Sequence, residues 1–135
     1  MPCMRVAVIS LFLCLVGGAA ADSDYERGMA LARATRWVEA KEAFEAGEHE
    51  APLDKRFPLE LAGIAFKQRD YAAARRHLDR ALLLDPRDSY ANDFLATIYR
   101  HLGIDAGQIT IPDFSGRPNL ILPRGAPIPE LEGQS

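Results

Sequence analysis

The chain has 135 residues, of which 48% are hydrophobic and 26% are charged. This length suits one domain, and this composition excludes a wholly disordered chain and a collagen-like repeat. The net charge of −3 lacks the basic excess that is typical of proteins that wrap nucleic acid. Both cysteines, Cys3 and Cys14, lie near the N-terminus.

Residues 1–21 have the pattern of a cleaved secretory signal peptide. Arg5 supplies one positive charge before an apolar run from Val6 to Val16, and small residues follow as far as Ala21. The run is shorter than the roughly 20 apolar residues that span a bilayer, so we expect cleavage after Ala21. The mature chain would then lack cysteine and be periplasmic or secreted, with no membrane attachment. An uncleaved membrane anchor is the alternative.

The sequence predicts five helices within residues 22–103. Ser23 and Glu26 have the spacing of a capping box at the start of the first helix. Asp54 is a candidate N-cap for the third helix, and Gly103 is a natural stop after the fifth. We expect helices over residues 24–34, over 37–48, from just after Asp54, over 71–84, and from just after Asp88 or Ser89 to Leu102.

A period of 34 residues relates these helices to one another. Residues of the same type recur at this spacing, among them Trp37 and Tyr71, Ala40 and Ala74, and Pro52 and Pro86. The alanines allow two helices to approach closely, and the prolines follow the second helix of each unit and stop it. Because several residue types keep the same phase, the period predicts a repeat architecture.

With this period the chain resembles the tetratricopeptide repeat family, and the best match is Leu61–Pro86, LAGIAFKQRDYAAARRHLDRALLLDP. The resemblance implies an all-α solenoid of helix–turn–helix units, about 2.5 repeats and five helices long. The units would be residues 22–54 and 55–88, followed by a partial unit over 89–103. Together with the signal pattern, it indicates an exported bacterial member of the family.

Residues 104–135 break the repeat pattern. The prolines from Pro112 to Pro129 lead us to expect no helix of any length there, and Ile109–Ile111 is the one strand-like fragment. We therefore expect an irregular, Pro/Gly-rich tail, extended or disordered, with two apolar patches at residues 109–114 and 120–122.

Residue types with catalytic or ligand chemistry show no recognisable arrangement. The histidines, His49, His77 and His101, are too far apart in sequence to form a metal-binding pair. No serine lies in a nucleophile elbow, and no glycine-rich loop offers a phosphate site. The basic run at Arg75–Arg80 contains Asp79 and lacks aromatic residues, so it indicates a solvated helix face. The sequence predicts no enzyme, no cofactor, no metal and no nucleic-acid partner.

The family resemblance implies a concave groove, lined by the first helix of each unit, that binds a peptide or protein segment. In the family's register the groove residues are Tyr25, Met29, Arg33, Leu59, Phe66, Lys67, Asp93, Thr97, Arg100 and His101. Leu59 and Phe66 are equally compatible with the core. The residues with which some family members clamp a C-terminal carboxylate are replaced here by Tyr25, Met29 and Glu60.

The leading hypothesis is a non-enzymatic protein–protein interaction module, a scaffold or adaptor, in the periplasm or secreted. The alternative is a small accessory subunit of an envelope-assembly or secretion complex. An enzyme with an unrecognised site is the third hypothesis.

The partial third unit leaves the predicted fifth helix without a second helix of its own. A terminal repeat needs a polar outer face, because an uncovered apolar arc promotes association. We expect the tail to cover this end by folding back Ile109, Ile111 and Phe114, or to bring the acidic Glu130 and Glu132 into the groove. The alternative is a solvated tail and a homodimer that buries the open helix.

Overall fold

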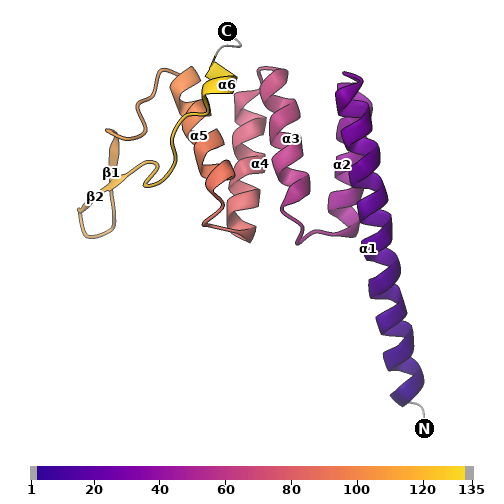
Figure 1. Ribbon diagram of the computed structural model, residues 1–135. Helices are drawn as coiled ribbons and strands as arrows, with labels where there is room; N and C mark the ends of the chain where they lie inside the picture. The colour runs from indigo at the N-terminus through magenta and orange to yellow at the C-terminus, as the bar shows by residue number, and fades with distance from the viewer. Residues whose placement is uncertain (1–2, 133–135) are drawn as a thin grey trace.

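The computed structural model describes residues 3–132, with side-chain detail for residues 18–131. Five long helices follow in chain order: α1 (Cys3–Arg33), α2 (Trp37–Glu50), α3 (Arg56–Lys67), α4 (Tyr71–Leu84) and α5 (Ser89–His101). A hairpin of β1 (Thr110–Pro112) and β2 (Pro118–Leu120) and a final turn, α6 (Pro129–Glu132), complete the described chain. The helices stand side by side and pack in consecutive pairs (Figure 1), which confirms the predicted all-α stack.

The helix ends fall close to the predicted ones, but the prediction of Asp54 as the N-cap of α3 is wrong. That helix begins at Arg56 after Lys55, and Asp54 Oδ1 accepts the backbone N–H of Arg56 at 3.0 Å. The fourth helix spans the predicted residues 71–84, and Asp70 Oδ1 accepts a hydrogen bond from the backbone N–H of Ala73 at 2.9 Å. Asp88 caps α5 in the same way, accepting from the N–H of Ala91 at 2.8 Å. Each carboxylate satisfies a donor that the first turn of a helix leaves unpaired.

Two groups of buried side chains hold the stack together. The first joins α1, α2 and α3 and contains Phe44 and Phe57. The second joins α3, α4 and α5 and contains Leu78 and Phe94. Close helix approach in the first group depends on Gly47, because a methyl group there would overlap the Phe57 ring. Ala40 and Ala74, the alanines that recur in the repeat pattern, are fully buried in the first and second group respectively.

The first helix is longer than predicted. It runs unbroken from Cys3 to Arg33, so Ser23 lies inside α1, and the expected start at residue 24 is wrong for the full chain. No proline separates the apolar N-terminal segment from the repeat, so one helix propagates through both. Figure 1 shows the N-terminal part of α1 extending past the other helices. Within the described residues, no helix is both long enough and apolar enough to cross a membrane.

The region after α5 is irregular, as predicted, and the strand-like fragment expected at Ile109–Ile111 overlaps β1. The sequence did not indicate β2 or the hairpin that the two strands form. Antiparallel pairing places Ile111 opposite Asn119. Asp113 Oδ1 closes the connecting turn by accepting the backbone N–H groups of Ser115 at 2.8 Å and Arg117 at 2.9 Å. The hairpin thus rests on backbone pairing and a local side-chain cap rather than on apolar alternation.

The expectation that prolines exclude every helix from the tail is wrong at α6. This turn begins at Pro129, and the first position of a helix needs no N–H donor, so proline is tolerated there.

The tail covers α5 with residues other than those expected. Ile109, Ile111 and Phe114 are exposed, so the prediction that they fold back is wrong. Ala106 and Leu122 are buried instead and belong to the second core group. The exposed three lie in or beside the hairpin, and this hairpin projects away from the helices (Figure 1).

Candidate functional site

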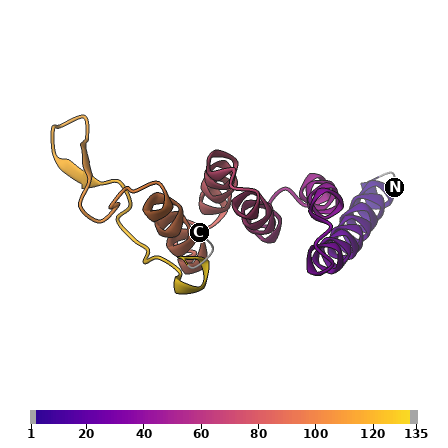
Figure 2. The same ribbon diagram turned by 90° about the horizontal axis from the view of Figure 1, so that it is seen from above.

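The predicted groove corresponds to one side of the stack. Seen from above, α1, α3 and α5 lie along one side, and α2 and α4 lie along the other (Figure 2). We call the surface formed by α1, α3 and α5 the first-helix face. Consecutive units contact each other there through equivalent residues, since Arg56 Nη2 donates to Asp22 Oδ1, 34 positions earlier, at 2.7 Å.

A hollow of about 250 Å³, which we call the Glu60 hollow, lies on the first-helix face. It draws on all three first helices, because α1, α3 and α5 each contribute to its lining. The lining residues are Tyr25 from α1, Arg56, Leu59, Glu60 and Gly63 from α3, and Tyr90 from α5. Two of the predicted groove residues, Tyr25 and Leu59, are therefore brought together here.

Glu60 is the half-buried acid of this hollow. The Tyr25 hydroxyl donates to Glu60 Oε1 over a long 3.2 Å. Removal from water raises the pKa of the Glu60 carboxyl, and the hydrogen bond from Tyr25 only partly opposes that effect. Burial, and then the negative charge of Glu60, raise the pKa of both Tyr25 and Tyr90.

Arg56, the cation of the hollow, is committed to two aspartates. Its guanidinium donates to Asp54 Oδ2 from Nε at 2.9 Å and from Nη2 at 2.7 Å, and to Asp22 Oδ1 at 2.7 Å. It also lies 4.7 Å from the centre of the Tyr25 ring. These hydrogen bonds raise the pKa of Arg56 above its usual value, so its positive charge is neutralised by Asp54 and Asp22.

The remaining predicted residues of α1 and α3 are spread apart. Met29 is half-buried against the first core group, and Arg33 is exposed at the end of α1. Phe66 is buried in the second core group, which is the alternative that the sequence left open. Lys67 is exposed, with Nζ 5.7 Å from the centre of the Trp37 ring.

The predicted residues of α5 lie beneath the tail. Residues 121–128, which we call the strap, cross this helix on the first-helix face. Asp93 Oδ1 accepts the backbone N–H of Ala126 at 2.8 Å, and the buried Thr97 Oγ1 accepts that of Ile128 at 2.7 Å. A segment of the chain itself therefore already occupies this part of the face.

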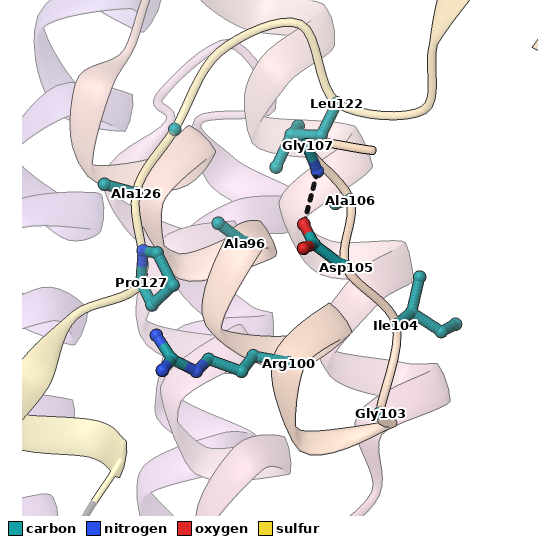
Figure 3. A pocket seen from close by; sticks show the side chains of 11 residues that line it. Ala96, Arg100, Gly103, Ile104, Asp105, Ala106, Gly107, Leu122, Ala126 and Pro127 are labelled. Atoms are coloured by element: carbon teal, nitrogen blue, oxygen red, sulfur yellow. Dashed lines mark hydrogen bonds between the residues drawn. The ribbon is translucent and has the colours of Figure 1, made fainter. Parts of the chain in front are cut away.

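The two other predicted residues of α5 have different surroundings. The ring of His101 packs edge-on against Phe66, with 5.1 Å between ring centres. Arg100 lines a second cavity of about 600 Å³, which lies between α5, the strap and the loop that follows α5. Figure 3 shows Ala126 and Pro127 on the strap side of this cavity.

Sequence reasoning left Arg56, Gly63 and Tyr90 out of the groove and treated Glu60 only as a departure from the family pattern. The 34-residue period could have found two of them. It generates two parallel series on the first-helix face: Asp22, Arg56 and Tyr90, and Tyr25, Leu59 and Asp93. The second series was predicted, and the first lies one helical turn before it.

Among the residues that the structure describes, no three His, Cys, Asp or Glu side chains are grouped so as to hold a metal ion.

A family model described as the tetratricopeptide repeat matches residues 31–98, half of the chain. The match and the paired helices agree, and the chain belongs to the tetratricopeptide repeat family. Repeats of this family generally mediate protein–protein interaction and are typically non-catalytic. A search of curated proteins finds no match to the chain.

Proposed function

We propose that this chain is a non-enzymatic interaction module that binds a peptide or protein segment on its first-helix face. The observation that carries the proposal is the Glu60 hollow, a partly buried polar site shared by α1, α3 and α5. A site assembled from three units exists only when the repeats stack. This explains why an interaction module would need the whole array.

The strap supports the same proposal. It is neither helix nor strand, and it lies on the first-helix face with backbone N–H groups donating to Asp93 and Thr97. A non-helical chain segment is therefore sterically and chemically compatible with this face. The strap crosses α5 and leaves open the Glu60 hollow, where a partner segment would bind.

Selection of random displayed peptides on the full chain tests the proposal. Tyr90→Ala removes a ring that lines the hollow, and we expect the selected peptides to bind this variant at least about tenfold more weakly. Leu83→Ala is the matched control, because Leu83 is 78% exposed on α4, a second helix. Peptides whose binding depends on Leu83 and not on Tyr90 would place the binding surface elsewhere.

We further propose that the protein is exported and that cleavage follows Ala21. The supporting observations are the signal-like sequence of residues 1–21 and the extension of this part of α1 beyond the other helices. Cleavage would remove the buried Ala21 methyl group from the first core group but would retain Asp22, the partner of Arg56. The new end would allow Ser23 and Glu26 to cap the shortened helix.

Expression in a bacterium followed by N-terminal sequencing tests the export proposal. We expect Asp22 as the first residue of protein recovered outside the cytoplasm. Met1 retained in a membrane fraction would favour the uncleaved anchor and contradict cleavage after Ala21.

A further inference from the structure

Among the side chains that the structure describes, the Glu60 carboxylate makes no ion pair, and its hydrogen-bond partner is the Tyr25 hydroxyl. A carboxylate removed from water is costly unless it is paired, and here the pairing group is missing. The raised pKa of Glu60 is the electrostatic expression of that cost.

Arg56, the cation among the described residues that line the hollow, does not supply this balance. Arg56 donates to Asp54 and Asp22, and its guanidinium covers the Tyr25 ring. Three carboxylates, those of Asp22, Asp54 and Glu60, thus accompany one guanidinium, which leaves a formal charge of −2 around the hollow. The local field favours a positively charged ligand.

Aromatic rings complete the chemistry of the site. The guanidinium of Arg56 lies 4.7 Å from the centre of the Tyr25 ring, so a ring of this hollow already stacks with a cation. The Tyr90 ring, which also lines the hollow, is 52% exposed. The volume, about 250 Å³, lies below the roughly 300 Å³ at which small-molecule sites usually begin, and suits a single long side chain.

We propose that the Glu60 hollow binds the lysine or arginine side chain of a partner segment, with its cationic head paired to Glu60 and its stem against Tyr90. The inference rests on the proposed function, because it names the chemistry of the segment that the first-helix face would bind. It specifies that the partner carries a basic anchor residue, whereas some family members clamp a C-terminal carboxylate of their partner. The segment would pass Asp22 and Asp54, whose charges also favour a basic partner.

The test uses the full chain with ¹³C-labelled tyrosine rings. The chain has four tyrosines, so NMR spectra report Tyr25 and Tyr90 at the hollow and Tyr71 and Tyr99 as internal controls. The probes are blocked alanine pentapeptides with arginine, lysine or citrulline at the centre. Citrulline keeps the shape of arginine but has no charge.

We expect the arginine and lysine peptides to shift the Tyr25 and Tyr90 signals and to leave Tyr71 and Tyr99 unchanged. The citrulline peptide should bind about tenfold more weakly, because it cannot pair with a carboxylate. Glu60→Gln should abolish the preference for arginine over citrulline while keeping an acceptor for the Tyr25 hydroxyl. Glu42→Gln, which removes the same charge from an exposed position on α2, should keep the preference.

Equal binding of the arginine and citrulline peptides, or an unchanged preference in Glu60→Gln, would overturn the inference. The comparison of arginine with citrulline uses the unmodified chain, so it does not depend on the variant folding. The basic anchor can be contradicted without contradicting the proposed binding on the first-helix face. Neutral peptides selected by display that shift Tyr25 and Tyr90 would overturn the basic anchor and leave binding on the first-helix face intact.

Discussion

Thr35 and Arg69 lie 34 positions apart and share the left-handed backbone conformation, with φ of 58° and 61°. Each ends the first helix of its unit in the same way. The N–H of the following residue donates to a carbonyl five positions back, from Arg36 to Leu31 and from Asp70 to Ala65, at 2.9 Å in both. A helix C-terminus closed by this hydrogen bond usually has glycine at the left-handed position. The repeat therefore extends to backbone geometry at positions where the side chains differ.

Replacing Arg69 with glycine should stabilise the fold. A left-handed conformation costs a residue with a Cβ about 1–2 kcal/mol, whereas the greater freedom of glycine in the unfolded chain costs about 0.4–1 kcal/mol. We expect the free energy of unfolding to rise by roughly 0.5–1 kcal/mol, measured by urea unfolding of the full chain. Gln68→Gly is the control, since Gln68 has φ of −81° and gains nothing from glycine. A loss of stability in Arg69→Gly would contradict the argument.

Two glycines within helices should respond to alanine in opposite directions. Gly47→Ala places a methyl group in the Phe57 ring, and overpacking of this kind costs about 1–3 kcal/mol, more than the roughly 1 kcal/mol that alanine contributes to a helix. Outside the backbone of its own helix and its chain neighbours, no atom lies within 4 Å of the position that a Cβ would take at Gly63, so Gly63→Ala should raise the free energy of unfolding by about 0.5–1 kcal/mol. Urea unfolding of both variants measures the contrast. Equal effects would show that α2 and α3 can separate without cost.

The helices could be predicted because local and repeat signals agree there. The helix α4 spans the predicted residues 71–84 and is followed by Pro86, and Asp88 caps α5 at the predicted start of that helix. The pairing of β1 with β2 could not be predicted, since both strands are exposed on both faces and show no apolar alternation. Its turn depends on Asp113, whose side-chain hydrogen bonds become visible only in the folded chain.

The candidate site could be predicted only in part. Tyr25 and Leu59 followed from the register of the repeat. Glu60 did not, because its half-burial depends on how α1 and α5 approach α3. Thr97 fits the register, yet the strap that covers it comes from a segment more than 20 residues away in sequence. Long-range packing therefore decides which groove residues remain open.

Glu60→Gln should raise stability at neutral pH but not in acid. Burial raises the pKa of Glu60 in the folded state above its unfolded value, so the folded chain binds the proton more tightly. Ionising Glu60 therefore lowers stability as the pH rises through the folded-state pKa. Below the unfolded pKa, the carboxyl is protonated in both states and this penalty is absent.

The measurement is the difference in urea unfolding free energy between Glu60→Gln and the unmodified chain, followed from acid to neutral pH. Because Glu60 keeps partial contact with water, solvent screening limits the gain at neutral pH to less than about 1 kcal/mol. Glu42→Gln controls for the loss of one negative charge at an exposed position. A difference that does not change with pH would contradict the assignment of Glu60 as an unbalanced acid.

Thr97→Val should loosen the strap. The substitution keeps the shape of the side chain but removes the Oγ1 that accepts the N–H of Ile128, leaving that half-buried donor unpaired at a cost of about 1–3 kcal/mol. Hydrogen exchange at the Ile128 amide should accelerate, and the free energy of unfolding should fall. Thr110→Val at an exposed strand position is the control. Unchanged exchange at Ile128 would mean that the hydrogen bond does not hold the strap.

Deletion of residues 104–135 should destabilise the stack and promote self-association. The tail buries Ala106 and Leu122 in the second core group, and burial of a leucine contributes about 1.5–3 kcal/mol. We expect the melting temperature to fall by about 5–10 °C and the uncovered face of α5 to favour dimers, seen by light scattering. Leu122→Ala should reproduce most of the thermal loss in the full chain, whereas Leu120→Ala, 42% exposed, should not. A truncated chain that stays monomeric with an unchanged melting temperature would show that the tail contributes nothing to the cover of α5.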